Sequence, residues 1–217
     1  MRQRTAILIS GRGSNMQALA RAAADPSYPA EIALVLSNQA GAPGLARAAE
    51  AGIATAVIAH KGMTREAHEE AIEAALRRHD IALVCLSGYL RILSPFLVRR
   101  WQGRMLNIHP SLLPSFPGLE THARALAAGV KLHGCTVHLV SETLDDGPIL
   151  AQAAVPVLAG DTPEILAARV LAQEHLIYPL ALGLLAGGRA AAPATGAALL
   201  NPLPGTLNPL PGAGPGS

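Results

Sequence analysis

Short apolar runs alternate with segments of helical pattern along most of this chain, and this alternation limits the possible folds more than any other feature. The apolar runs predict strands at 5–10, 31–37, 53–59, 81–87, 105–108, 134–140 and 149–157. The segments between and after them predict helices at 14–24, 43–51, 64–79, 94–101, 120–128 and 162–186. Such a series favours an α/β fold, with a mostly parallel sheet and helices on both faces.

The composition suits a buried core and gives little support for a nucleic-acid or membrane partner. Half of the 217 residues are hydrophobic and 15% are charged, with a formal net charge of only +2. Aromatic residues make up 3%, which leaves few platforms for stacking bases. The chain leads directly into its first strand without a signal peptide, and no apolar run reaches the roughly 18 residues of a membrane span. We therefore expect a cytoplasmic protein that acts on small molecules.

Two further features concern redox state and domain organisation. Cys85 and Cys135 each sit inside an apolar run, which predicts buried, reduced thiols. Residues 1–188 carry the whole strand and helix pattern and are expected to form one domain. Residues 189–217 are rich in Ala, Gly and Pro, with a repeated Asn-Pro-Leu-Pro-Gly, and are expected to be disordered unless the repeat is a docking segment.

A glycine-rich turn separates the first predicted strand from the first predicted helix. Glycines let the backbone approach a ligand, and the N–H groups of Gly13, Ser14 and Asn15 would face an anion at the helix start. The alternative is a tight turn in which Ser14 caps the helix. A dinucleotide site is disfavoured because Met16 occupies the place of the third glycine of Gly-x-Gly-x-x-Gly. The turn therefore indicates a phosphorylated small molecule.

Polar residues gather at the ends of two later strands. Alternate side chains of an extended segment share a face, so Asn107 and His109 leave the same side of their strand. His138 and Asp145 come at the end of another strand and in the turn after it. Because ligands bind at the carboxyl ends of parallel strands, we expect these four side chains to meet. Three of these residues could instead have purely structural roles: His138 as a core residue, Asp145 as a turn former and Asn107 as a cap.

The residue pattern disfavours metal and covalent chemistry. His68 starts a His-Glu pair on a predicted helix, but the second histidine of a zinc-protease helix is missing. His133, Cys135 and His138 are close in sequence, but the last two would point to opposite faces of a strand. No Gly-x-Ser-x-Gly motif for an activated serine is present. An amide beside an imidazole can instead polarise a carbonyl and move a proton.

Three segments, 107–118, 11–15 and 144–148, together resemble the phosphoribosylglycinamide formyltransferase family of purine biosynthesis. The similarity runs in one register from residue 5 to about residue 188. It implies a Rossmann-like formyltransferase fold. The implied reaction moves the formyl group of 10-formyltetrahydrofolate to the amine of glycinamide ribonucleotide (5'-phosphoribosylglycinamide). Because the substrate brings its own nucleophile, an amine, no reactive Ser or Cys is needed, and no metal is expected.

The resemblance also assigns roles to residues. Asn107 and protonated His109 would stabilise the oxyanion, and Asp145 would support His109 and the proton transfer. The residues implied to bind the ribonucleotide are Gly13, Ser14, Asn15, Gln173 and Glu174. Those implied to bind the formyl donor are Arg65, Leu90, Arg91, Ile92, Leu93, Asn107, Ser141, Glu142, Thr143, Leu144 and Asp145.

Departures from the family pattern and rival readings remain open. Asp146 stands where some relatives have glycine, and Leu171 where some have a polar residue. Formyltetrahydrofolate hydrolase is the nearest alternative, since a poorly bound amine would let water react. Methionyl-tRNA formyltransferase carries a folded RNA-binding domain that residues 189–217 cannot supply, and a non-catalytic binding module has no need of Asn107, His109 and Asp145 together. The sequence leaves open whether the protein is a monomer or a homodimer.

Overall fold

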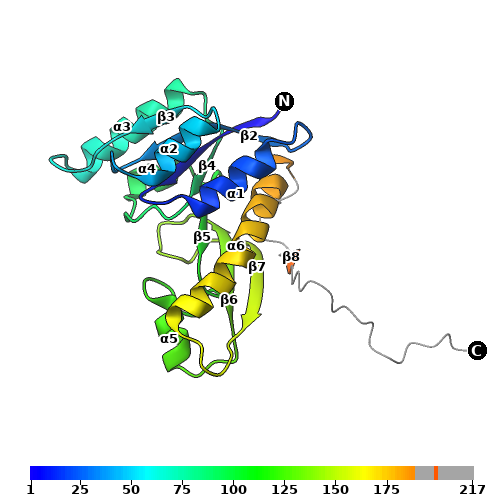
Figure 1. Ribbon diagram of the computed structural model, residues 1–217. Helices are drawn as coiled ribbons and strands as arrows, with labels where there is room; N and C mark the ends of the chain where they lie inside the picture. The colour runs from blue at the N-terminus through cyan, green and yellow to red at the C-terminus, as the bar shows by residue number, and fades with distance from the viewer. Residues whose placement is uncertain (189–197, 200–217) are drawn as a thin grey trace, which may run out of the picture.

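The computed structural model describes residues 1–188 and 198–199, which form one sheet flanked by helices (Figure 1). The sheet order is β3-β2-β1-β4-β5-β6-β7-β8. The strands are β1 (Gln3–Ile9), β2 (Ala30–Ser37), β3 (Thr55–Val57), β4 (Leu83–Leu86), β5 (Met105–His109), β6 (Leu132–Leu139), β7 (Ile149–Pro156) and β8 (Ala198–Leu199). The helices are α1 (Ser14–Ala23), α2 (Pro43–Glu50), α3 (Arg65–Arg78), α4 (Pro95–Arg100), α5 (Thr121–Ala127) and α6 (Pro163–Ala186).

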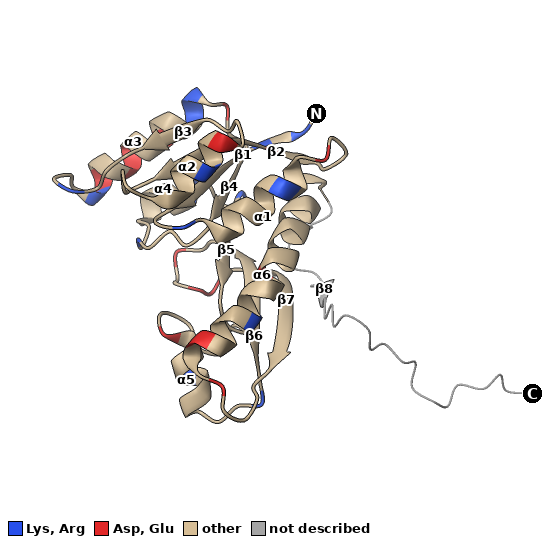
Figure 2. Ribbon diagram, in the orientation of Figure 1, with Lys and Arg blue, Asp and Glu red and all other residues tan. Residues whose placement is uncertain are grey.

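Helices cover both faces of the sheet, as the sequence predicted. Alternate side chains of a strand point to opposite faces, so Ile7 and Ile9 of β1 pack with α1, α2, α5 and α6. Ala6 and Leu8 of the same strand pack with α3 and α4 on the other face. The fold class and its helix layers are therefore confirmed. Figure 2 shows basic and acidic residues interspersed over the helices and loops.

The strands do not all run in one direction. β1 pairs in parallel with β2 and β4, and β4 pairs in parallel with β5. β6 runs antiparallel to both β5 and β7. The chain between β5 and β6, which includes α5, does not cross the sheet as a link between parallel strands must. It stays near the end of β5, where Thr121 Oγ1 at the start of α5 donates to Pro110 O. The expectation that the turn after β6 follows a parallel strand is therefore wrong.

The seven predicted strands and six predicted helices occur in the predicted order, with differences at their ends and one added short strand, β8. β3 has three residues instead of the predicted seven. Thr64 caps α3 as its sequence position suggests, since its hydroxyl accepts from Ala67 N at 3.1 Å. Within the predicted tail, residues 198–199 form β8, which pairs with β7, and the expected disorder of the tail stays a prediction. The rest of 189–217 lies outside the described residues.

Helix α6 is 24 residues long and lies against the centre of the sheet. Tyr178 is fully buried, and its hydroxyl lies 2.9 Å from Leu86 O and 3.3 Å from Leu106 O, so it ties α6 to β4 and β5. By length and composition α6 is also the one helix in the described chain that could cross a membrane. Its buried face, which includes Val170 and Ile177, is what a core helix of a globular protein shows.

Candidate active site

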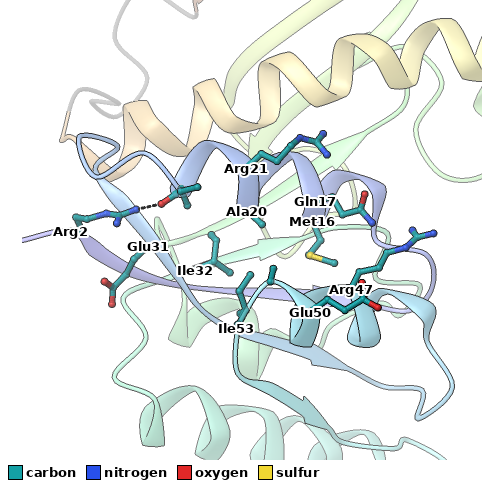
Figure 3. Close-up of a pocket in the computed structure, with 14 residues that line it drawn as sticks. Arg2, Met16, Gln17, Ala20, Arg21, Glu31, Ile32, Arg47, Glu50 and Ile53 are labelled. Atoms are coloured by element: carbon teal, nitrogen blue, oxygen red, sulfur yellow. Dashed lines mark hydrogen bonds between the residues drawn. The ribbon is translucent and has the colours of Figure 1, made fainter.

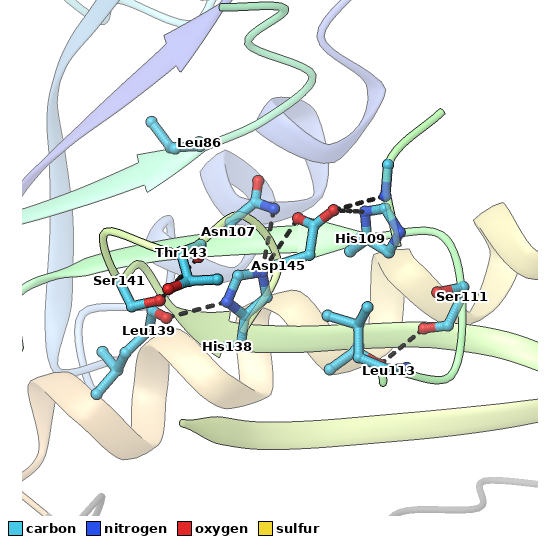
Figure 4. Close-up of polar contacts among 12 residues, drawn as sticks. Leu86, Asn107, His109, Ser111, Leu113, His138, Leu139, Ser141, Thr143 and Asp145 are labelled. Carbon is cyan, nitrogen blue, oxygen red and sulfur yellow. Dashed lines mark hydrogen bonds and ion pairs between the residues drawn. The ribbon is translucent and has the colours of Figure 1, made fainter. Parts of the chain in front are cut away.

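Asn107 and His109 lie on one face of β5, and the loop after β6 meets them there (Figure 4). In the antiparallel pairing of β5 with β6, Asn107 stands opposite His138. Asp145 reaches the same place from the loop that follows β6. The four polar residues singled out from the sequence therefore come together.

The His109 ring is held between two acceptors. Nδ1 lies 3.4 Å from Asp145 Oδ2, and Nε2 lies 3.1 Å from the Phe116 carbonyl oxygen. The His109 and Asp145 side chains are only 8% and 6% exposed. An imidazole donates from both nitrogens only in its charged form, so this geometry suits protonated His109. The longer contact leaves the Nδ1–H group the freer of the two donors.

Asp145 reaches His109 because its loop folds back over the sheet. Its backbone is left-handed (φ 54°), a conformation that aspartate tolerates better than most residues. Its Oδ2 accepts from Gly118 N at 2.9 Å, which joins this loop to the one that follows β5. Gly147 lets the loop return, since a Cβ there would stand 1.7 Å from Leu139 O. Loop geometry, and not a parallel strand end, therefore places the carboxylate.

His138 is the fourth member of the centre, and the sequence left its role open. Its Nδ1 lies 2.9 Å from Leu139 O, and its Nε2 lies 3.2 Å from Asn107 Nδ2 and 3.9 Å from Asp145 Oδ1. Burial lowers the pKa of His138, which favours the neutral ring. A neutral ring that donates from Nδ1 offers its Nε2 lone pair to one N–H of Asn107. The second N–H of that amide remains for a ligand.

The glycine turn leads into α1. Gly13 precedes the helix in a left-handed conformation (φ 69°), and no side chain caps the helix, so the reading of Ser14 as a cap is wrong. The turn packs on α2, where Gly44 N donates to Gly11 O at 3.1 Å. A Cβ on Gly44 would lie 2.5 Å from Ile9 Cδ1, so only glycine fits there. The first backbone N–H groups of α1 have no partner within the helix and remain available to an anion.

A buried polar group stands beside this turn. Asn15 Nδ2 donates to Glu174 Oε2 at 2.6 Å, so the structure joins two of the predicted substrate residues from distant parts of the chain. Burial raises the pKa of the Glu174 carboxyl. Among the described residues, Asn15 Oδ1, Gln173 Oε1 and His175 Nε2 are buried atoms without a hydrogen-bond partner. Such atoms are rare in native proteins, and a polar ligand beside the turn would satisfy Asn15 Oδ1.

The glycine turn and the polar centre lie at the same edge of the sheet. Leu8 of β1 pairs with Leu86 of β4, which pairs with Asn107 of β5. Two strand spacings, about 10 Å, therefore separate the two features. Two cavities of about 810 and 290 Å³ lie elsewhere, the larger between α1, α2 and β2 (Figure 3), and neither is lined by Asn107, His109 or Asp145.

The residues implied to bind the formyl donor fall into three groups. Leu90 and Ile92 are 75% and 65% exposed on the loop 88–94 that follows β4, and Leu93 packs on the core. In the loop after β6, the side chain of Glu142 pairs with Arg99 of α4 at 2.6 Å. Ser141, Thr143, Leu144 and Arg91 lie on these same two loops. Arg65 is exposed at the start of α3, and no hydrogen bond or ion pair links it to Asn107, His109 or Asp145.

The described residues contain no group of three or more His, Cys, Asp or Glu side chains arranged to hold a metal. The expectation that the chemistry needs no metal stays a prediction.

Comparison with known proteins identifies the family. The family model described as Formyl transferase matches residues 3–182. Phosphoribosylglycinamide formyltransferase of Escherichia coli is 47% identical over 184 residues, which are 84% of this chain and 87% of that protein. The chain belongs to the phosphoribosylglycinamide formyltransferase family. The crystal structure of the Brucella melitensis phosphoribosylglycinamide formyltransferase is similar to this structure, with a TM-score of 0.83 and 58% identity, over 90% of this chain and all of that one.

Longer proteins also match this formyltransferase chain. The trifunctional purine biosynthetic protein adenosine-3 of Bos taurus is 52% identical over 186 residues, and the chain spans 18% of its length. In Drosophila pseudoobscura pseudoobscura the corresponding protein is 51% identical, and the chain spans 14% of it. The resemblance seen in the sequence and the formyltransferase fold that it implied are thus confirmed.

Proposed function

We propose that this chain transfers the formyl group of 10-formyltetrahydrofolate to the amine of glycinamide ribonucleotide in de novo purine biosynthesis. The observation that carries the proposal is the meeting of Asn107, His109 and Asp145 two strand spacings from a helix start that suits phosphate. Family membership supports the same reaction class. Both candidate binding regions lie within residues 1–188.

The chemistry uses a nucleophile that the substrate brings. The amine nitrogen attacks the formyl carbon, and the carbonyl electron pair moves to oxygen. The free N–H of Asn107 donates to that oxyanion, and the positive charge of protonated His109 stabilises it. When the intermediate collapses, the bond from the formyl carbon to the folate nitrogen breaks, and the amine proton passes to that nitrogen. Asp145 keeps the His109 charge paired and receives the proton on its way.

The ribonucleotide would lie along the start of α1. The N–H groups of Gly13, Ser14 and Asn15 would hold its phosphate, because a helix start concentrates unpaired donors and positive partial charge. Glu174 would accept from the ribose hydroxyls, and the free atoms of Asn15 and Gln173 would take up the remaining polar groups. These roles account for polar atoms that the protein leaves buried and unsatisfied.

The folate donor would lie between the loops that follow β4 and β6. Leu90 and Ile92 offer exposed apolar surface to a flat ring, and Leu93 supports them from the core. The loop 141–145, tied to α4 by the Glu142–Arg99 pair, would form the opposite side, with Arg91 and Arg65 toward the acidic end of the folate. This arrangement would present the formyl group to Asn107.

The decisive experiment mixes purified protein with 10-formyltetrahydrofolate, with and without glycinamide ribonucleotide, and measures tetrahydrofolate. Release only in the presence of the ribonucleotide supports the proposal. Release without it would indicate a hydrolase, and no release in either case would indicate a binding protein. In His109→Ala, turnover should be lost while the ribonucleotide still binds. An active His109→Ala enzyme would contradict the role given to this residue.

A further inference from the structure

Ser10 lies between β1 and the glycine turn, and its hydrogen bonds reach another loop. Its backbone N–H donates to Gly88 O at 3.1 Å, and its Oγ accepts from Leu90 N at 2.9 Å. Ser10 therefore bonds to the loop after β4 through both its backbone and its side chain. Ser10 itself is only 5% exposed, so water competes little for these bonds.

A second layer of polar groups holds the Ser10 hydroxyl in place. It donates to Asn38 Oδ1 at 2.7 Å, and Asn38 is only 3% exposed at the end of β2. His60 Nδ1, from the chain after β3, lies 3.2 Å from Asn38 Nδ2. A hydroxyl has one proton to donate and lone pairs to accept, so donation to Asn38 leaves Oγ free to accept from Leu90.

The two segments joined by Ser10 belong to different candidate binding regions. Gly11 to Asn15 follows Ser10 directly and forms the turn suited to phosphate. Gly88 and Leu90 begin the exposed loop with the apolar surface for the donor. At the far end of this loop Ser94 N donates to Glu69 Oε1 at 2.8 Å, and between the two ends Tyr89 and Leu93 pack on the core. Within the described chain, neither Ser94 nor Glu69 has a hydrogen bond to the glycine turn.

We propose that Ser10 is a positioning residue that couples the two substrate sites. Because these bonds tie the glycine turn to the start of the loop 88–94, a ligand that restrains the turn also restrains the loop through Ser10 and Leu90. The second ligand then binds a loop that is already ordered, so each ligand strengthens binding of the other by the same factor. The inference rests on the proposed function, because it takes a ribonucleotide and a folate as the two ligands.

The test measures the dissociation constant of tetrahydrofolate by calorimetry, with and without saturating glycinamide ribonucleotide. Tetrahydrofolate lacks the formyl group, so no turnover disturbs the titration. The wild-type protein should bind it about fivefold more tightly when the ribonucleotide is present, the lower end of common coupling factors. In Ser10→Ala the factor should fall below about twofold, because Leu90 N loses its acceptor.

Ser94→Ala is the matched control, since it removes the hydroxyl that donates to Glu69 Oε2 at the far end of the same loop, while Ser94 N keeps its bond to Glu69 Oε1. It should weaken tetrahydrofolate binding equally with and without ribonucleotide, so the factor of about five should persist. Ser10→Cys, which keeps the side-chain size but is a weak acceptor, should behave like Ser10→Ala and serves if alanine impairs folding. Melting temperatures of all variants check that they are folded.

The outcomes separate the two proposals. An unchanged factor in folded Ser10→Ala or Ser10→Cys, or a factor near one in the wild type, overturns the coupling role while the proposed function stands. An equal loss of the factor in Ser94→Ala also overturns it, because any loosening of the loop would then suffice. Failure of the wild type to bind either ligand overturns the proposed function together with this inference.

Discussion

Replacing Asp145 with asparagine should disable the enzyme while leaving the fold intact. The carboxylate oxygen lies 3.4 Å from His109 Nδ1, and both side chains are less than a tenth exposed. With an effective dielectric constant of about 20, two unit charges at that distance attract each other by about 5 kcal/mol. Each 1.4 kcal/mol, roughly, is tenfold in rate, so kcat/KM should fall by about 1,000-fold once partial compensation by water is allowed for. Asparagine also tolerates the left-handed backbone at this position.

The assay follows tetrahydrofolate release with both substrates at neutral pH, and thermal unfolding confirms that the variant is folded. Asp146→Asn is the matched control, because it removes the same charge from the next residue, which is exposed. Its rate should stay within about twofold of wild type, as is usual for surface positions. An Asp145→Asn rate within tenfold of wild type would refute the charge pairing as a source of catalysis.

Three other substitutions test the same structure. Burial raises the pKa of Glu174, so the neutral carboxyl stabilises the folded protein relative to the ionised form. This contribution to the free energy of unfolding is present below the unfolded pKa of about 4.3 and is lost as pH rises through the higher folded pKa. Glu174→Gln should therefore melt above wild type at pH 7 to 8, but not near pH 4, while binding the ribonucleotide more weakly. His138→Phe removes the acceptor that orients Asn107 and should lower kcat about tenfold with little change in KM for the donor, as steady-state kinetics would show. Tyr178→Phe leaves a buried carbonyl of β4 without its donor and should cost about 1 to 2 kcal/mol, read as a melting point lowered by about 2 to 8 °C.

The elements with strong local signals were predictable from the sequence. Thr64 and the acidic first turn after it mark the start of α3, and the structure shows the expected cap. The apolar run of β4 is buried on both faces, as a central parallel strand requires. β3 is shorter than the apolar run 53–59 that predicted it, and its short length follows from its place at the sheet edge, which local pattern does not encode.

The candidate site was likewise predictable from the sequence only in part. The residue types could be found from the sequence, because an amide and a histidine two positions apart on a strand share a face whatever the rest of the chain does. The pairing of Asn107 with His138 could not be found, since it depends on the register between β5 and β6. The partners of Ser10, 28 and 80 residues away, were equally hidden.

The sequence by itself determined the alternation of strands and helices, the glycine turn, and the chemical character of Asn107, His109 and Asp145, because these depend on residue type and on spacing within a few positions. Only the tertiary structure decided that β6 runs against β5 and that its following loop doubles back over the sheet. The physical reason is that strand direction and loop path are set by contacts between residues far apart in the chain, such as Gly118 with Asp145, and no local pattern records them.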